Sequence, residues 1–338
     1  MTELLIRAVD YHTGGEPFRI LTDPVELPGR TVAERRQHAI DNPEVNRLRQ
    51  VLCYEPRGHA DMYGGFITPP DDDGAHFGVL FWHKDGFSTA CGHGTIALGV
   101  WAVQTGRVPF SSSGTTEVVI DVPSGRVLAR VHSAGQRVTS VDFVNVPSYV
   151  TASDVEVATS HGPVVVTLAF GGAFYAIADA ALLGMTVTQE HLPRLIAAGR
   201  EIRRLLDGSA HAQHPYDPRL SGVYGTIFYE DLGQSADGSL LHRNVTIFAD
   251  GEVDRSPCGS GTCARLAALH AAGEIRKDQW LTHESIVGSR FRARVLDTVL
   301  AGDRPAVVPQ VRGMAYKTGE HTFVVDPDDN LTPGFVLR

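Results

Sequence analysis

The sequence predicts an α+β fold built from two similar domains, each a barrel-like sheet around a central helix. The first observation is a stretch that occurs twice, as CGHGTIALGVWAVQTG from residue 91 and as CGSGTCARLAALHAAG from residue 258. The second is that short segments with strand-like alternation dominate the remaining sequence. The third is that the helix-compatible residues in both copies are mostly small and apolar, as in helices buried inside a sheet.

The individual elements follow from Gly, Pro and Asp boundaries and from the spacing of apolar residues. In the first half we expect strands at 4–12, 77–83, 117–123 and 126–132. A helical pattern at 32–52 is interrupted at Pro43, because proline breaks a helix interior. Later in the chain we expect a helix at 192–206 and strands at 163–170, 225–230, 244–250 and 321–327.

The two copies of the repeated stretch also predict how the chain divides. A β-rich segment precedes a buried helix in each half, so we expect two domains related by an approximate twofold, with the active site in the cleft between them. The first domain should comprise 1–130 together with 315–338, and the second 131–314. The C-terminal segment is assigned to the first domain because it lies far along the chain from the second copy.

The bulk composition favours an ordinary folded protein that binds a small molecule. The 338 residues carry a net charge of −9, which disfavours nucleic acid or an anionic membrane as the main partner. Four cysteines are too few for a disulfide framework and the N-terminus lacks a signal-peptide core, so we expect a cytoplasmic protein with reduced thiols. No apolar run approaches the roughly 20 residues that span a membrane.

A cysteine opens each copy of the repeated stretch, and a Gly-rich turn then leads into the helical run. Cys91 and Cys258 should therefore lie at helix N-termini, where unpaired N–H groups and the helix dipole stabilise a thiolate. The same N–H groups can bind a substrate carboxylate. Two such thiols could remove a proton from one face of a carbon and return it to the other. This chemistry requires no metal or organic cofactor, and we expect neither.

Several segments together resemble the proline racemase family, which includes hydroxyproline 2-epimerases and trans-3-hydroxyproline dehydratases. They are DYHTGGEPFRI, EPRGHADMYGG, STACGHGTIALG, AFGGAFYAI, DRSPCGSGT and HESIVGS. The resemblance implies the two-domain fold shared with diaminopimelate epimerase, a homodimer, and catalysis by Cys91 and Cys258. It places Asp254 near the substrate amine. The positions that resemble the family's carboxylate-binding residues are Gly92, His93, Gly259 and Ser260.

Two reactions remain open within this resemblance. Cysteine at both catalytic positions favours a cofactor-independent racemase or epimerase of proline or hydroxyproline, with 4-hydroxyproline 2-epimerisation first. The alternative is trans-3-hydroxy-L-proline dehydration, which begins with removal of the same α-proton. The dehydratase branch has threonine where this sequence has Cys258, whereas epimerases typically have asparagine where it has Ala173. The residue at position 258 therefore favours an epimerase, whereas the residue at position 173 favours a dehydratase.

Other interpretations carry less weight. Cys53 and Cys263 are expected to be small buried hydrophobic residues. A zinc site built from Cys91, His93, Cys258 and Cys263 fits no known spacing. The segments GHGTIA and GSGTCA match a dinucleotide-binding pattern, but neither is followed by the acidic residue that such sites use. A binding protein for imino acids would not need two thiols.

Two of the candidate residues have alternative roles. The ring of His93 could steady the Cys91 thiolate, or only its backbone N–H could matter. Asp254 could contact the substrate, or it could cap the turn before Cys258.

Overall fold

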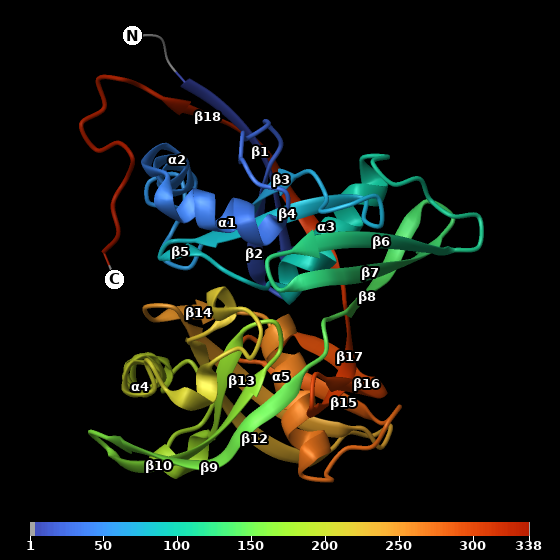
Figure 1. Ribbon diagram of the computed structural model, residues 1–338, viewed down its shortest axis with the longest axis vertical. Coiled ribbons are helices and arrows are strands. Elements are labelled where there is room, and N and C mark those ends of the chain that lie inside the picture. The colour runs from blue at the N-terminus through green and yellow to red at the C-terminus, as the bar shows by residue number, and fades with distance from the viewer. Residues whose placement is uncertain (1–3, 338) are drawn as a thin grey trace. The chain divides into compact units, whose positions relative to one another are not determined.

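The computed structural model describes residues 4–337 (Figure 1). The chain divides into two compact units. Unit 1 comprises the chain up to Thr139 together with the chain from Met314 onward, and unit 2 is the continuous segment Ser140–Gly313. A cut at residue 130, as expected from the sequence, would fall inside strand β7 (Gly125–Ala134) and split a hairpin.

Unit 1 is a curved sheet with the order β18-β1-β2-β3-β4-β6-β7, and β5 adds to the edge of β4. Helix α3 contacts strands from both ends of this order, so the sheet curls around it. The strands are β1 (Leu4–Thr13), β2 (Glu16–Leu21), β3 (Tyr63–Thr68), β4 (Phe77–His83), β5 (Gly86–Phe87), β6 (Thr115–Val122), β7 (Gly125–Ala134) and β18 (Ala315–Val325). The helices are α1 (Val32–Asp41), α2 (Pro43–Cys53) and α3 (Gly92–Gln104).

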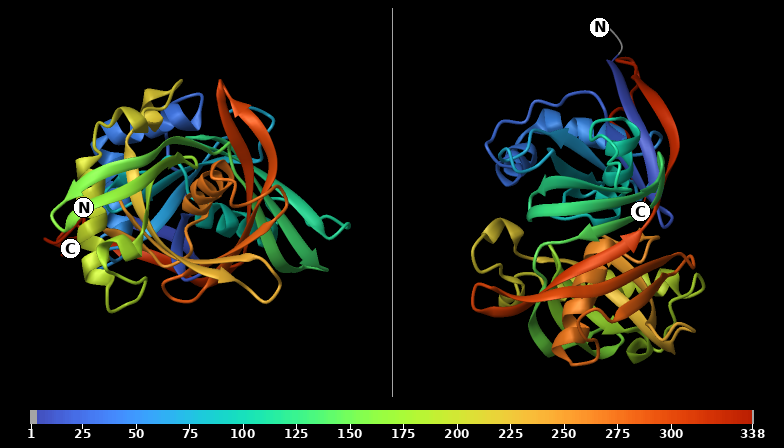
Figure 2. Two further views of the ribbon diagram at one scale, coloured as in Figure 1. Left: turned by 90° about the horizontal axis from the view of Figure 1, so that it is seen from below. Right: turned by 90° about the vertical axis from the view of Figure 1, so that its right-hand side faces the viewer.

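Unit 2 has the order β9-β10-β11-β12-β13-β15-β16-β17, with β14 paired to β13. The left-hand view of Figure 2 shows helix α5 inside the curve of these strands. The strands are β9 (Tyr149–Thr159), β10 (Gly162–Phe170), β11 (Phe174–Asp179), β12 (Val223–Gln234), β13 (Leu240–Phe248), β14 (Glu252–Asp254), β15 (Trp280–Ser285), β16 (Arg290–Ala301) and β17 (Arg304–Gly313). The helices are α4 (Leu192–Leu205), α5 (Gly259–Ala271) and the 3-10 turns η1 (Ala180–Leu183), η2 (Ala210–Ala212) and η3 (Pro218–Leu220).

The two units are built to one plan. From β18 to β7 in unit 1 the successive pairings are antiparallel, antiparallel, parallel, antiparallel, parallel and antiparallel. From β9 to β16 in unit 2 the series is the same. Each unit also places its buried helix directly after the short strand that pairs with β4 or β13. The predicted α+β fold of two similar domains around central helices is confirmed.

The two central helices are enclosed by the strands of their units, and most of their residues are small or apolar. Every residue of α3 from Gly92 to Val103 is buried, and so is every residue of α5 from Gly259 to Leu269. Small residues allow strands to approach on all sides of such helices. These helices therefore form the core of each unit, and their first residues are buried along with the rest of the helix.

The predicted interruption at Pro43 is confirmed as a junction between α1 and α2. Asn42 ends α1 and caps α2, where its side-chain oxygen accepts hydrogen bonds from the N–H groups of Glu44 and Val45. Proline is tolerated at the first position of α2 because the N–H that it lacks would have no partner within the helix. The single predicted pattern is thus two helices.

The first and last strands of the described chain both belong to unit 1, where β18 pairs antiparallel with β1 along its length (Figure 1). The chain enters unit 2 through β8 (Arg137–Val144) and leaves it through β17, and these strands pair with Val141 opposite Gly313. Among residues 4–337, no helix is both long and apolar enough to cross a bilayer.

Candidate active site

The first thiol site is the start of α3 in unit 1. Cys91 is the N-cap of this helix, and its sulfur accepts the backbone N–H of Gly94 at 3.2 Å. The N–H groups of Gly92 and His93 belong to the first helical turn, where no partner exists within the helix. The predicted placement of the thiol at a helix N-terminus is confirmed. The site offers a sulfur and backbone donors that can hold an anion.

The His93 ring lies against the Cys91 sulfur, with Nδ1 at 3.5 Å and Nε2 at 3.6 Å. Burial lowers the pKa of His93 to about 3, so the ring is neutral near pH 7. A ring N–H is hydrogen-bonded to the backbone of Pro17, which leaves the other nitrogen as an acceptor. The imidazole therefore accepts a hydrogen bond from the thiol and does not form a charged pair with it.

Aromatic residues hold the His93 ring in place. Phe18 and Tyr63 meet it edge-on, with ring centroids at 5.8 Å and 5.0 Å. Tyr63 also lies against His83, with ring centroids 5.5 Å apart, and its hydroxyl is hydrogen-bonded to Ser88. These contacts fix the imidazole beside the sulfur.

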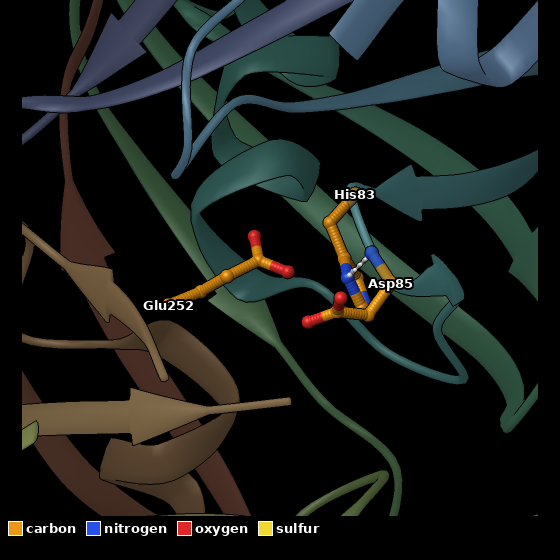
Figure 3. Close-up of side chains that lie close together, drawn as sticks. All are labelled: His83, Asp85 and Glu252. Carbon is orange, nitrogen blue, oxygen red and sulfur yellow. Dashed lines mark hydrogen bonds between the residues drawn. The ribbon is translucent and has the colours of Figure 1, made fainter. Parts of the chain in front are cut away.

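His83 ends β4 and is hydrogen-bonded to the turn that follows, since its Nδ1 accepts the backbone N–H of Asp85 at 3.2 Å (Figure 3). Burial lowers the pKa of His83 to about 3, so this ring is also neutral. Figure 3 also labels Glu252, which belongs to β14 of unit 2. Within either unit taken alone, residues 4–337 contain no group of three His, Cys, Asp or Glu side chains close enough to hold a metal ion.

The second thiol site is the start of α5 in unit 2. Cys258 is the N-cap, and its sulfur accepts the N–H of Gly261 at 3.3 Å, as Cys91 does from the equivalent glycine. The hydroxyl of Tyr175, on β11, lies 4.0 Å from the Cys258 sulfur and 2.7 Å from the Ser260 hydroxyl. The N–H groups of Gly259 and Ser260 lie in the first helical turn. Here, too, a thiol and backbone donors occur together.

Burial shifts the pKa of two acidic groups at the second thiol site upward, toward the protonated form. Burial raises the pKa of Cys258 well above its usual value, and the nearby Asp254 carboxylate raises it further. Burial also raises the pKa of Asp254 to about 6, although hydrogen bonds from Ser256 oppose this change. The Cys258 thiol is therefore an acid at neutral pH, whereas Asp254 is mostly ionised.

Asp254 caps the turn before Cys258, because its Oδ1 accepts the N–H of Ser256 at 2.8 Å and the Ser256 hydroxyl at 2.7 Å. The same hydroxyl accepts the backbone N–H of Cys258 at 3.1 Å. Asp254 is thus linked to Cys258 through Ser256, and a side-chain hydrogen bond also joins the two directly.

Each unit brings together its own share of the residues singled out from the sequence. Cys91, Gly92 and His93 share one helix start, while Asp254, Cys258, Gly259 and Ser260 surround the other. The remaining cysteines lie in the cores. Cys53 is buried at the end of α2, and burial raises the pKa of Cys263 to about 12.

Sequence reasoning did not single out Tyr175. It lies within the segment AFGGAFYAI, but nothing in that segment indicates which side chain points to α5. Strand alternation gives two candidate faces, and only the pairing of β11 with β12 fixes which face meets the helix. Burial and the neighbouring Cys258 raise the pKa of Tyr175 well above 10, so its hydroxyl is neutral.

Comparisons with known proteins match the chain almost completely. A family model described as proline racemase covers residues 8–336. A trans-3-hydroxy-L-proline dehydratase of Bacillus cereus is 44% identical, covering 97% of each chain. A 3-hydroxyproline 2-epimerase of Burkholderia multivorans is 42% identical, covering 98% of each. The solved structure of a hydroxyproline epimerase from Agrobacterium vitis, with bound trans-4-hydroxy-L-proline, has a TM-score of 0.91 at 30% identity, covering 98% of this chain and 96% of that one.

Proposed function

This chain belongs to the proline racemase family, and from that premise we propose that it dehydrates trans-3-hydroxy-L-proline. Within this family the chain is an enzyme that either inverts the α-carbon of proline or a hydroxyproline, or dehydrates 3-hydroxyproline. The relatives at 42% and 44% identity are named for 3-hydroxyproline, which supports that substrate. The structural observation that carries the proposal is the Cys91 thiol, which caps the start of the buried helix α3 beside the His93 ring.

In the proposed reaction Cys91 removes the α-proton. In the free protein the neutral imidazole of His93 accepts the hydrogen bond of the thiol, and the ring is proposed to take the thiol proton only once the substrate is bound. A bound substrate carboxylate would favour the protonated ring, because a nearby negative charge raises the pKa of an imidazole. The resulting thiolate is stabilised by the N–H of Gly94 and the helix dipole. Cys258 is the poorer base of the two, because its pKa is raised.

The helix starts supply the groups that bind the substrate. The N–H groups of Gly92, His93, Gly259 and Ser260 are proposed to hold the substrate carboxylate. Removal of the α-proton places negative charge on that carboxylate, and each preorganised donor aimed at it contributes roughly 3 to 4 kcal/mol to the transition state. The Asp254 carboxylate is proposed to pair with the substrate amine.

The stereochemistry of the substrate explains why one thiol is enough for dehydration. In trans-3-hydroxy-L-proline the carboxylate and the hydroxyl are on opposite ring faces, so the C2–H and the hydroxyl share a face. A base on that face removes the proton, the C2–H and C3–O bonds break, and a C2=C3 double bond forms. The proton leaves with the hydroxide as water, and the product is a pyrroline-2-carboxylate.

The second candidate is 2-epimerisation of a hydroxyproline, and the observation that favours it is Cys258 itself. A buried thiol that is protonated at neutral pH is suited to deliver a proton to the opposite face of the α-carbon. This candidate includes the 4-hydroxyproline reaction that the sequence favoured, which the Agrobacterium vitis structure also supports. The two candidates differ in whether the reaction needs the second thiol.

The test compares Cys91→Ser and Cys258→Ser with the unaltered protein. Serine remains a good N-cap, so the helix starts are kept while the thiols are lost. Each protein is incubated in D2O with trans-3-hydroxy-L-proline, trans-4-hydroxy-L-proline and L-proline, and proton NMR follows the α-proton and new products. Dehydration predicts a pyrroline from the 3-hydroxy substrate, a loss of at least about 100-fold in Cys91→Ser, and retained activity in Cys258→Ser.

Epimerisation predicts a different pattern. The opposite diastereomer appears with deuterium at the α-carbon, and both single variants lose at least about 100-fold. Consumption of none of the three substrates by the unaltered protein, with both thiols reduced, would overturn both candidates.

A further inference from the structure

The two copies of the repeated stretch differ in backbone conformation at the cysteine. Cys91 is extended, with φ −155° and ψ 103°. Cys258 has φ 62° and ψ 110°, which places a residue with a side chain in the left-handed region. Few residues other than glycine, asparagine and aspartate adopt this φ, because the Cβ collides with the backbone. The second thiol is therefore carried on a strained residue, whereas the first is not.

The peptide bond before Cys258 is held from both sides. The carbonyl of Pro257 accepts hydrogen bonds from Asn244 Nδ2 at 2.9 Å and from Thr262 Oγ1 at 3.0 Å. The N–H of Cys258 donates to the Ser256 hydroxyl at 3.1 Å. Both polar groups of this peptide are therefore fixed, and the peptide cannot rotate to relieve the strain without breaking buried hydrogen bonds.

The matching threonine in the first copy has a different partner. Thr95 Oγ1 donates to the carbonyl of Cys91 at 2.8 Å, which is the ordinary back-bond of a helical threonine. Thr262 occupies the same place in the motif, but its hydroxyl reaches one residue further back, to Pro257. The difference follows the backbone difference, since only the second copy has a strained cysteine.

The sheet supports the Thr262 hydroxyl. Because Thr262 Oγ1 donates to Pro257, it accepts a hydrogen bond from Nδ1 of His283, which lies 2.8 Å away. Burial lowers the pKa of His283 well below its usual value, so the ring is neutral. Asn244 and His283 lie on the neighbouring parallel strands β13 and β15. Two side chains of one rigid sheet thus converge on the turn that precedes α5.

We propose that Asn244 and Thr262, with His283 behind Thr262, are positioning residues that hold Cys258 in its left-handed conformation and so aim its thiol. We call these three residues the Pro257 clamp. The clamp sets the direction of the Cα–Cβ bond of Cys258, which keeps the sulfur on the Gly261 N–H and beside the Tyr175 hydroxyl. The catalytic role of this orientation rests on the second candidate function, 2-epimerisation, whereas the backbone strain at Cys258 does not depend on either function.

The strain is tested without any substrate by comparing glycine with alanine at each cysteine. Because glycine adopts positive φ freely, Cys258→Gly should melt several degrees above Cys258→Ala. Glycine is also the better N-cap at both positions, so Cys91→Gly should exceed Cys91→Ala only by this smaller capping difference. Adding Thr262→Val should reduce the glycine advantage at position 258 to the size seen at position 91, because a released peptide no longer imposes the strain. A glycine advantage that is absent at 258, or unchanged by Thr262→Val, would overturn the proposal.

The positioning role is tested in the protein with both thiols. Thr262→Val should lower kcat for 2-epimerisation at least tenfold with KM changed less than twofold, and Thr262→Ser should restore most of it. The matched control is Thr95→Val, which removes the equivalent hydroxyl from the first copy and should change kcat less than threefold. Asn244→Ala, which removes the other donor, gives the same readout if Thr262→Val does not fold.

The outcomes separate the clamp from the proposed function. Equal losses in Thr262→Val and Thr95→Val would overturn the clamp. If the unaltered protein only dehydrates, the exchange of the substrate α-proton should depend on Thr262 no more than on Thr95, and the melting comparison alone decides whether the clamp exists. If no hydroxyproline reacts, the proposed function fails while the melting comparison still tests the clamp.

Discussion

At the scale of single residues, each of the two thiols caps the start of its own helix, but their neighbouring side chains differ. Each sulfur accepts an N–H from the glycine three positions later. Cys91 lies against a neutral imidazole, whereas Cys258 lies near a carboxylate and a phenol. The chemical identity of the cysteines was readable from the sequence. The neutrality of His93 was not, because it follows from burial among aromatic side chains that come from distant strands.

Asp254 predicts a pH dependence of stability. Its pKa is about 6 in the folded protein and about 3.9 when unfolded, so the folded state binds the proton more tightly. Stability from this residue is therefore fully present below pH 4 and is lost as the pH rises to 6. In Asp254→Asn this loss disappears. Relative to the unaltered protein, the variant should gain up to roughly 3 kcal/mol in unfolding free energy between pH 4 and pH 7.

Urea unfolding at several pH values measures this difference. Asp250→Asn is the matched control. Asp250 is an exposed carboxylate in the turn between β13 and β14, and it pairs with Arg200. A difference between Asp254→Asn and the unaltered protein that does not change with pH would show that folding does not raise the pKa of the Asp254 carboxyl.

Tyr175 predicts a specific effect on the second thiol. In Tyr175→Phe the ring remains, but the hydroxyl between Cys258 and Ser260 is lost. One hydrogen bond of this kind is worth about 1 kcal/mol, so in the 2-epimerisation candidate proton delivery by Cys258 should slow by roughly fivefold. Removal of the α-proton by Cys91 should be unaffected. The ratio of epimerised to exchanged substrate in D2O reports both steps.

Tyr149→Phe is the control for this substitution. Tyr149 is another buried tyrosine of unit 2, and its hydroxyl has no hydrogen-bond partner among residues 4–337. If Tyr149→Phe and Tyr175→Phe alter the ratio equally, the contact between Tyr175 and Cys258 has no catalytic role.

At the scale of elements, the sequence predicted the features that depend only on residues close together in the chain. The break at Pro43 and the helix starts at Cys91 and Cys258 were readable because capping and proline act within a few residues. The parallel pairings β2–β3 and β4–β6 were not, because each joins strands that are separated by at least one helix. The Pro257 clamp was unpredictable for the same reason, since Asn244 and His283 meet the turn only through the register of β13 and β15.

The start of α3 predicts a steric effect at Gly94. A Cβ at this position would lie 2.7 Å from the Cys91 sulfur and would also collide with Phe18. Alanine normally stabilises a helix interior by about 1 kcal/mol relative to glycine. Here Gly94→Ala should instead destabilise unit 1 by about 1 to 3 kcal/mol, because the crowded site cannot expand. A thermal melt in which Gly94→Ala gains stability would contradict the close packing of Phe18 on α3.

At the scale of the whole molecule, unit 2 is one continuous segment whereas unit 1 needs both ends of the chain. β18 forms the edge of unit 1 beside β1, and Phe323 and Val325 pack on its core. The guanidinium of Arg19 also lies over the Phe323 ring at 4.3 Å. Unit 1 therefore depends on a strand that follows unit 2 in the sequence.

This dependence predicts how fragments behave. Residues 140–313 alone should fold cooperatively, whereas residues 1–139 alone should not, because β1 would lack its partner and part of the core would be open. Joining 314–338 to 1–139 through a flexible linker should restore a cooperative melt by circular dichroism. The assignment of β18 to the fold of unit 1 would be wrong if fragment 1–139 melted identically with and without that segment.

The pairing of β8 with β17 has a consequence for how such chains can be recombined. The points where the chain enters and leaves unit 2 are hydrogen-bonded neighbours, with Val141 opposite Gly313. Unit 2 is thus a cassette, here meaning a continuous segment that is entered and left through one pair of hydrogen-bonded strands, β8 and β17. These two strands are the stem, and removal of the segment would leave chain ends that are already adjacent. Exchanging this cassette between relatives at the stem would transplant the second thiol with its clamp intact. Chimeras cut at Thr139 and Met314 could therefore trace a difference in reaction between relatives to one half of the protein.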